Sequence, residues 1–559
     1  MEAQADPEFL RSPWRFLMAD LATAVHVIPG SPSLPPSQLD RTFTSRPTRA
    51  GVWIFVLALL AGLGYIGVHL AKDLDNVTVT GIWPYLLLGL ALLIALGFEF
   101  VNGFHDTANA VATVIYTNSL PPHIAVVWSG LCNLTGVLLS SGTVAFAVIT
   151  LLPVELILKV SSGTGFAMVF ALLIAAILWN LGTWWFGLPA SSSHTMVGSI
   201  IGVGLASQLM NQHGRTSGLD WSQVIKVLEA LLISPLLGFA LAGILLLLSK
   251  RLFRYPALYE APKGNEPPPW PIRALMVGTC TGVSYFHGSN DGQKGMGLIM
   301  LILIGTVPTA YALNHDVSPA EVQSFIAASV QAGQILDRHV PSGTPDPDAR
   351  TEITDYIQSK QLQPGTLLAL SQLVGELNRE VSAYNSLRSI PAQQQTNIRN
   401  DMYLAGRALK IMDPSHDPAF TAQESAALKV YQGKLDKATK FIPIWVKVAV
   451  ALALGLGTMV GWKRIVVTVG EKIGKEHMTY AQGASAGLVT MVTIYAADTW
   501  SLPVSTTHIL SSGVAGTMAA NGSGLRWSTV RAIAAGWIFT LPAAAVLSGL
   551  LYLLFHAIF

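Results

Sequence analysis

Charged side chains are scarce in this sequence, and long stretches of it have none. Asp, Glu, Lys and Arg make up 12% of the 559 residues, against 51% hydrophobic residues, whereas a soluble domain carries about 25% charged residues. None of the four types occurs in 107–154, 160–214, 295–315 or 532–559. Each stretch reaches the roughly 20 residues that an apolar helix needs to cross a bilayer. The pattern argues against a large soluble protein and predicts an integral membrane protein.

Cysteine, a basic face and a signal peptide are also lacking. Cys132 and Cys280 each lie in an apolar run, so the sequence predicts no disulfide framework and no cysteine-based metal site. The formal net charge is +2, and Lys and Arg cluster in short loops, so no nucleic-acid partner is expected. The polar, Pro-containing segment 1–50 has no short apolar stretch ending in a cleavage site, and we expect a poorly ordered tail there.

Apolar runs predict an all-α fold with about ten to twelve helical segments. Several runs stop at clusters of Gly, Pro or Ser, notably at Gly103, Pro189, Gly288 and Pro503. Such stops are typical of half-helices or re-entrant hairpins. The candidate spans are 52–71, 83–103, 124–151, 166–187, 194–211, 228–249, 272–286, 295–312, 442–461, 479–497, 505–520 and 531–556.

A polar, amphipathic stretch interrupts these runs and predicts a soluble helical insertion at 313–440. The insertion separates 51–312, which holds the first membrane half and the start of the second repeat, from the remainder of that repeat at 441–559. The segments 250–273 and 463–475 are the most basic short loops, and the positive-inside rule places both in the cytoplasm. We also expect the insertion on the cytoplasmic side.

Two polar motifs occur twice, in the same order. Gly103-Phe-His-Asp-Thr-Ala-Asn109 aligns with Gly288-Ser-Asn-Asp-Gly-Gln-Lys294, which superposes Asp106 on Asp291 and Asn109 on Lys294. Farther along, Leu188-Pro-Ala-Ser-Ser-Ser-His194 matches Leu502-Pro-Val-Ser-Thr-Thr-His508. The repetition indicates an internal duplication, inverted or parallel, of the kind that forms secondary transporters with a site at the repeat interface.

Each motif suits a buried polar site. An Asp at membrane depth costs roughly 2.5–3.5 kcal/mol, so Asp106 and Asp291 are expected to bind a cation, carry a proton or fix a loop by accepting hydrogen bonds. Hydroxyl residues after a Pro favour a helix N-terminus, whose free N–H groups and partial positive charge bind oxyanions. Ser and Thr in membrane helices also often bond to their own backbone, but a matched pair favours an oxyanion site and hence a transporter for a small oxyanion.

Ionisable neighbours add candidates for proton or cation handling. His105, His194, His287 and His508 lie within or beside the motifs, as proton relays or as neutral hydrogen-bonding groups. Glu99 precedes Asp106 by seven residues, which places the two on roughly the same helix face.

Together, Asn102-Gly-Phe-His-Asp-Thr-Ala-Asn-Ala110, His287-Gly-Ser-Asn-Asp-Gly-Gln-Lys-Gly295 and the two Leu-Pro-x-Ser segments resemble the PiT family of inorganic phosphate transporters, in particular the bacterial low-affinity Pit type. The resemblance runs from about Pro84 to the C-terminus and leaves 1–71 uncovered. It implies two inverted structural repeats with broken or re-entrant helices, a homodimer in the cell (inner) membrane, and phosphate bound between the halves. It also implies that the chain is not an enzyme.

The resemblance also assigns the site by motif position. It implies substrate-binding roles for Asp106, Asn109, Ser191, Ser192, Ser193, Asn290, Asp291, Lys294, Ser505, Thr506 and Thr507. Glu99, His105, Asp106 and Asp291 are the candidates for proton or cation coupling, and no metal ligand set is assigned.

Departures from the family pattern concern coupling. Gly-Phe-His-Asp at 103–106 replaces the usual Gly-Ala-Asn-Asp, and Asn133 stands where sodium-coupled relatives tend to have Glu. These departures favour proton symport over sodium symport, with phosphate carried as a neutral complex with a divalent metal and no permanently bound cofactor. A sodium-coupled symporter, a sulfate or other oxyanion carrier, a membrane enzyme acting on phosphate esters and a channel are the alternatives.

Overall fold

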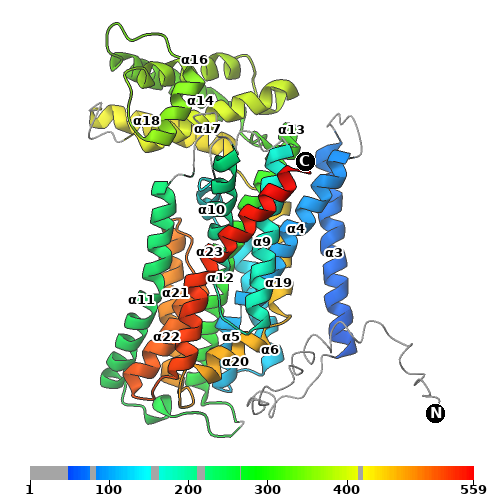
Figure 1. Ribbon diagram of the computed structural model, residues 1–559, viewed down its shortest axis with the longest axis vertical. Helices are drawn as coiled ribbons and strands as arrows, with labels where there is room; N and C mark the ends of the chain where they lie inside the picture. The colour runs from blue at the N-terminus through cyan, green and yellow to red at the C-terminus, as the bar shows by residue number, and fades with distance from the viewer. Residues whose placement is uncertain are drawn as a thin grey trace, which may run out of the picture. The chain divides into compact units, whose positions relative to one another are not determined.

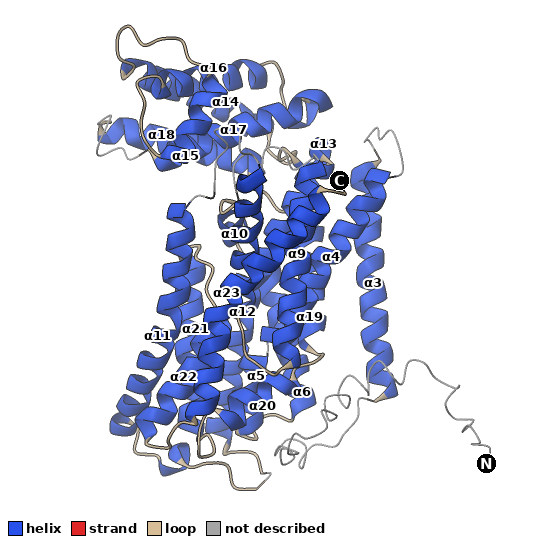
Figure 2. Ribbon diagram, in the orientation of Figure 1, coloured by secondary structure: helices blue, strands red, loops and turns tan. Residues whose placement is uncertain are grey.

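The computed structural model describes residues 48–75, 83–106, 108–152, 163–210, 219, 221–264, 266–412 and 420–558. In these residues every regular element is a helix, apart from an isolated β-bridge between Gly474 and Leu525 (Figure 2). The predicted all-α class is therefore confirmed. Most of the N-terminal tail prediction, 1–47, lies outside the described residues.

Helices of the expected apolar runs surround a buried core. They are α3 (Arg49–Leu74), α4 (Trp83–Asp106), α5 (Ala108–Tyr116), α6 (Pro122–Leu139), α7 (Thr143–Ile149), α9 (Gly163–Trp185), α10 (Ser192–Met210), α11 (Trp221–Leu252), α12 (Trp270–Thr306), α13 (Pro308–Tyr311), α19 (Ile444–Thr458), α20 (Lys463–Val467), α21 (Tyr480–Thr499), α22 (Thr506–Asn521) and α23 (Trp527–His556). A π-helical turn at Thr468–Lys472 follows α20, and a 3-10 turn at Pro256–Tyr259 follows α11.

Six helical stretches in the described chain are long and apolar enough to cross a membrane, and a bent pair that includes α19 adds a seventh. One of the six is the broken pair α4 and α5, taken together from Tyr85 to Tyr116. The helices that carry the second motif, α10 and α22, are shorter and mostly buried. Because other helices cover them, they do not need an apolar surface toward lipid, and they can carry hydroxyl groups.

The helix contacts repeat in pairs across the two halves. Helix α4 packs on α19 while its counterpart α12 packs on α6, and α10 packs on α23 while its counterpart α22 packs on α11. Each half therefore supplies the neighbours of the other. Helices α11 and α23 are counterparts, because α11 follows α10 and α23 follows α22 along the chain. Figure 1 shows that they run in opposite directions through the bundle, α23 toward the C-terminus. The expected inverted arrangement is confirmed.

One of the four predicted helix breaks is wrong. Gly288 lies in the middle of α12, one unbroken helix that joins the expected span 272–286 to most of the expected span 295–312. The break expected at Gly103 falls three residues later, where α4 ends at Asp106. Both glycines also serve close packing. A Cβ at Gly103 would lie 2.2 Å from the Leu454 carbonyl oxygen, and a Cβ at Gly288 would lie 2.1 Å from that of Asn133. The glycines allow the α4–α19 and α6–α12 crossings to bring backbone against backbone.

The breaks that the prolines predict are present. Helix α9 ends at Trp185 and α10 begins at Ser192, while α21 ends at Thr499 and α22 begins at Thr506 after its N-cap Ser505. Helix α4 also ends at Asp106, and α5 begins at Ala108. The two breaks after Trp185 and Thr499 place hydroxyl-rich helix N-termini inside the bundle.

The polar stretch after α13 folds into helices that pack on one another around their own apolar core (Figure 1). They are α14 (Pro319–Arg338), α15 (Ala349–Ser359), α16 (Thr366–Ser382), α17 (Ala392–Ile411) and α18 (Ala422–Thr439), with a 3-10 turn at Leu387–Ser389. The two ends of the segment meet, because the Asn314 N–H donates to the Ala438 carbonyl over 2.8 Å.

Candidate functional site

The hydroxyl-rich segments form two equivalent helix N-termini. The Ser191 Oγ accepts from the His194 N–H over 3.2 Å, and the Ser505 Oγ accepts from the His508 N–H over the same distance. Both serines therefore cap their helices, α10 and α22, as Ser does when it satisfies an N–H of the first turn. The hydroxyl residues that follow each cap lie on the first turn, where backbone N–H groups have no helical partner.

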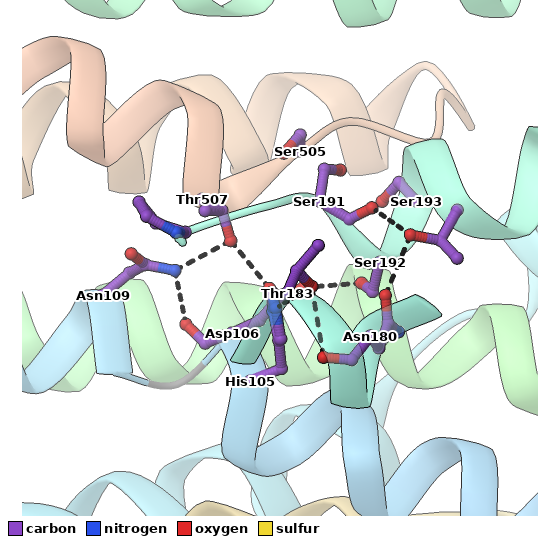
Figure 3. Close-up of polar contacts among 12 residues, drawn as sticks. His105, Asp106, Asn109, Asn180, Thr183, Ser191, Ser192, Ser193, Ser505 and Thr507 are labelled. Carbon is purple, nitrogen blue, oxygen red and sulfur yellow. Dashed lines mark hydrogen bonds and ion pairs between the residues drawn. The ribbon is translucent and has the colours of Figure 1, made fainter. Parts of the chain in front are cut away.

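Asp106, at the end of α4, is the centre of the first polar cluster (Figure 3). Its Oδ1 accepts from the Thr507 hydroxyl over 2.7 Å and from the His105 ring Nδ1 over 3.0 Å. Its Oδ2 accepts from the Ser192 hydroxyl over 2.5 Å. Three side chains from both repeats thus converge on one buried carboxylate, and a role as a simple helix cap is excluded.

Asp291, in the middle of α12, is the centre of the second cluster. Its Oδ1 lies 2.6 Å from the Lys294 ammonium, and its Oδ2 lies 3.5 Å from the same Ser192 hydroxyl that reaches Asp106. The Lys294 ammonium also donates to the Ser193 hydroxyl over 2.5 Å and to the Val504 carbonyl over 3.3 Å. The side chains of Asp291, Lys294 and both serines are buried.

The contacts between the clusters follow the repeat. The Asn109 amide donates to the Thr507 hydroxyl over 2.8 Å, and Lys294, its counterpart, donates to the counterpart hydroxyl of Ser193. The first motif of each half therefore holds the second motif of the other half. The symmetry is incomplete, because Lys294 brings a charge where Asn109 brings an amide.

The remaining predicted ligands lie around the same centre. The Asn290 amide donates to the Leu502 carbonyl over 3.1 Å, which leaves its Oδ1 buried without a hydrogen-bond partner in the described chain. The Asn109 Oδ1 and the Thr506 hydroxyl are also buried without one. Every predicted substrate-binding residue thus lies in or beside this centre.

The predicted coupling residues differ in their surroundings. His105 bonds through Nδ1 to Asp106 and through Nε2 to the Thr183 hydroxyl, 3.1 Å away. Glu99 is fully buried and lies against the Gly295 backbone of α12, with Asn102 as its polar neighbour. Neither Glu99 oxygen accepts a hydrogen bond of normal geometry from a described residue. The His194 and His508 rings pair with each other, with centroids 4.3 Å apart.

Sequence reasoning missed several residues of the site. Thr183 positions His105, and Asp498 accepts from Ser289 over 2.8 Å and from Gln293 over 2.9 Å, tying the end of α21 to α12. One signal was available for Asp498, since it is the only acidic residue after Glu476. Nothing in the sequence distinguishes Thr183 from the other hydroxyl residues of the apolar helices.

The centre combines hydrogen-bond acceptors, which suit a cation, with hydrogen-bond donors, which suit an anion. Two buried carboxylates face a group of hydroxyls, an amide, an ammonium and two helix N-termini. Among the described residues, one group of His, Cys, Asp and Glu side chains lies close enough together to hold a metal ion, namely Asp106, His287 and Asp291. The site can therefore bind a cation and an oxyanion side by side.

Comparison with known proteins identifies the family. The chain is 41% identical over 486 residues to the low-affinity inorganic phosphate transporter PitA of Escherichia coli, covering 84% of this chain and 96% of that protein. It is 38% identical over 491 residues to the low-affinity inorganic phosphate transporter of Buchnera aphidicola, with 84% and 96% covered. It is 28% identical over 471 residues to a probable low-affinity inorganic phosphate transporter of Bacillus subtilis, with 84% and 97% covered.

A solved structure of a sodium-dependent phosphate transporter aligns with 85% of this chain and all of its own, at a TM-score of 0.45 and 17% identity. The profile of the phosphate transporter family matches residues 102–548, which include both copies of both motifs. Because these relatives are transporters, the prediction that the chain is not an enzyme is confirmed. The match over most of the chain and the identity to the Pit proteins establish that this chain belongs to the phosphate transporter family.

Proposed function

We propose that this member of the phosphate transporter family, an inorganic phosphate transporter, is a secondary active symporter that moves phosphate with protons by alternating access. In this proposal phosphate travels as a neutral complex with a divalent metal. The observation that carries it is the meeting of two hydroxyl-rich helix N-termini, one from each repeat, with two buried aspartates.

The helix N-termini supply the phosphate site. Their partial positive charge and free N–H groups favour an oxyanion. Ser192, Ser193, Thr506 and Thr507 add hydroxyl donors on the first turns of α10 and α22. Ser192 and Thr507 now donate to Asp106, so phosphate binding would exchange these internal hydrogen bonds for bonds to the substrate. Such an exchange between neutral donors keeps binding reversible, as transport requires.

Charge balance favours a metal-phosphate complex over bare phosphate. The Asp106 and Asp291 carboxylates and the Lys294 ammonium sum to one negative charge (two minus one). Bare HPO4 2− would add two further negative charges to a buried site, where two like charges 4 Å apart repel by about 4 kcal/mol at an effective dielectric constant of 20. A divalent cation that enters with the phosphate leaves the net charge of the site unchanged.

Proton coupling is supported by the residues beside the phosphate site. The Glu99 carboxyl is buried without a hydrogen-bond partner in the described chain, so binding a proton or a cation there removes the cost of a buried, unpaired charge. His105 stands where the usual family motif has an Asn, which removes an amide oxygen that could bind sodium. Sodium symport is the alternative, and carriage of sulfate is the second, because sulfate presents the same tetrahedral oxygens to the helix ends.

The bacterial relatives support a location in the cell (inner) membrane. The homodimer that the family resemblance implies stays a prediction.

Uptake by the purified protein in proteoliposomes tests the proposal. We expect uptake of labelled phosphate to be driven by an imposed pH gradient, to need Mg2+ or another divalent metal, and to be indifferent to a sodium gradient. Asp291→Asn and Ser192→Ala should each lose at least tenfold in uptake. Uptake driven only by sodium would overturn proton coupling, uptake of sulfate without competition from phosphate would overturn the substrate, and normal uptake by both variants would overturn the site.

A further inference from the structure

Three potential metal ligands meet between α4 and α12. Ligand atoms of Asp106, His287 and Asp291 all lie within 4.8 Å of one another, and all three residues are buried. The Ser192 hydroxyl lies 2.5 Å from the Asp106 Oδ2 and 3.5 Å from the Asp291 Oδ2. The two Oδ2 atoms therefore face a common point, while each Oδ1 atom is held elsewhere, by Thr507 and His105 or by Lys294.

His287 is oriented by a relay that runs away from this point. The Thr458 hydroxyl donates to the Leu454 carbonyl over 2.9 Å, so it accepts from the Asn133 amide nitrogen, 3.3 Å away. The amide oxygen of Asn133 then faces the His287 Nδ1 at 2.7 Å. This contact places the ring hydrogen on Nδ1 and leaves a lone pair on Nε2. A metal-binding histidine is held in the same way, because its second nitrogen donates to an oxygen acceptor.

The free nitrogen of His287 points at an acceptor. Its Nε2 lies 3.6 Å from the Asp291 Oδ2 and has no hydrogen-bond partner in the described chain. His105 differs, because both of its ring nitrogens have partners. Two lone pairs that face each other in a buried site repel, and a cation between them removes the repulsion.

We propose that Asp106, His287 and Asp291 bind the divalent metal that accompanies phosphate, and that Asn133 is a positioning residue that fixes the His287 tautomer. This inference rests on the proposed function, since the metal is part of the transported complex. It also assigns a use to Asn133, whose amide replaces a carboxylate expected in sodium-coupled relatives: the amide turns the histidine toward a metal.

The ligand types select among metals. Tetrahedral ligands at about 2.1 Å from a metal lie about 3.4 Å apart, and the 3.6 Å between His287 Nε2 and Asp291 Oδ2 is close to that spacing. Three protein ligands leave a position open for a phosphate oxygen. An imidazole beside two carboxylates suits Zn2+, Co2+ or Mn2+, whereas Mg2+ and Ca2+ prefer oxygen ligands alone. The site should therefore bind Zn2+ and Co2+ more tightly than Mg2+.

Metal binding to the purified full-length protein, without phosphate, tests the inference. We expect Co2+ to give a visible absorption band and Zn2+ to displace it. His287→Gln should weaken Co2+ and Zn2+ binding at least tenfold, with a smaller loss for Mg2+. Asn133→Leu should weaken Zn2+ binding by about 10–100-fold, as loss of an outer-shell partner does, and Asn133→Asp, which keeps an acceptor, should restore it. The exposed His123→Gln, on the same helix as Asn133, is the matched control.

The outcomes separate this inference from the proposed function. Unchanged Zn2+ affinity in both His287→Gln and Asn133→Leu would overturn the metal site, even if wild-type phosphate uptake were normal. Wild-type protein that binds Co2+ through His287 but takes up no phosphate would support the metal site and overturn the proposed function. Equal affinity of the wild type for Mg2+ and Zn2+ would overturn the role of the imidazole.

Discussion

Asn109 and Lys294 hold equivalent positions in the two repeats, yet they differ in charge. Each donates to a hydroxyl on the helix end of the opposite repeat, so the cross-repeat bond is kept while the charge is not. Lys294 neutralises Asp291, whereas Asp106 accepts from two hydroxyls and an imidazole. Removing one partner of a buried ion pair costs about 3–5 kcal/mol, so Lys294 and Asp291 depend on each other for stability.

Glu99 gives the residue-scale test of coupling. Its carboxyl is buried against the Gly295 backbone without a normal hydrogen bond. The protonated, neutral form is therefore more favourable there than the charged carboxylate. We expect Glu99→Gln, which imitates the protonated form, to lose stimulation of phosphate uptake by a pH gradient by at least tenfold. Phosphate exchange across the membrane at equal pH should persist, because the residues proposed to bind phosphate are unchanged.

The exposed Glu229→Gln on α11 is the matched control and should keep full stimulation. Both variants are compared by uptake and by exchange in the same vesicles. A pH gradient that still drives uptake by Glu99→Gln would show that the coupling proton binds elsewhere, with His105 as the next candidate.

At this scale the repeated motifs were sufficient to find the residues of the buried polar centre but not their connections. Asp106, Asp291 and the hydroxyl residues could be predicted because the duplication marks them twice. The Ser192 hydroxyl lies between both carboxylates, although Ser192 is 99 positions from Asp291 in the chain. Asn133 contacts His287 across a separation of 154 positions. Only the crossing of α6 and α12 brings the latter pair together, and a sequence pattern does not encode that crossing.

At the scale of helices, the repeated glycines explain how the buried helices approach one another. The first-motif glycines, Gly103 and Gly288, align in the sequence and make equivalent contacts. Each lies against a backbone carbonyl of a helix from the opposite half, α19 for Gly103 and α6 for Gly288. The facing residues, Gly457 and Gly136, are glycines as well, and a Cβ there would lie 2.1 Å and 2.0 Å from a carbonyl oxygen. The sequence predicted a break at Gly288, which lies inside α12, because Gly has two uses, turns and close contacts, and the local pattern does not separate them.

Gly288→Ala tests the packing role. Its Cβ would lie 2.1 Å from the Asn133 carbonyl oxygen, so α6 and α12 would have to separate. Overpacking of this kind costs about 1–3 kcal/mol, and we expect a clear drop in the thermal unfolding midpoint of the protein in detergent. Gly278→Ala on the same helix has open space around its Cβ and should leave the midpoint unchanged or raise it, because Ala favours helix. Equal midpoints for the two variants would contradict the packing role.

At the scale of the molecule, the inverted pairing of helices and the helical segment at 313–440 are separate features. The pairing could be predicted in outline from the duplication, but the choice of partners could not, since the motif-bearing helices pack most extensively on helices of the other half. The segment at 313–440 has its own apolar core and joined ends. It also contains complete helix starts, with capping boxes at Ser318–Glu321 and Thr421–Glu424.

These features predict that residues 313–440 fold without the membrane helices. Expressed alone, the fragment should be soluble, helical by circular dichroism and cooperative in thermal unfolding, because its apolar core is formed from its own helices. Replacing the buried Leu370 by Asp should abolish the transition, since it places a charge in that core. An insoluble fragment, or one that melts without a transition, would show that the segment depends on the contact between α13 and α17.

The capping boxes give the same fragment a pH dependence of known sign. Hydrogen bonds from the Thr421 backbone and side chain hold the pKa of Glu424 below its ordinary value of 4.5. A carboxyl whose pKa is lower in the folded state stabilises the fold above its unfolded pKa, and that contribution is lost as the pH falls through the folded pKa. The free energy of unfolding should therefore decrease below about pH 4.5.

Asp401 has a pKa raised by burial and acts in the opposite direction, so the effect of Glu424 must be isolated. Glu424→Gln keeps the capping geometry without the titration, and its stability should fall less steeply with acid than that of the parent fragment. Parallel pH curves for the two fragments would show that ionisation of Glu424 does not contribute to the stability of the folded state.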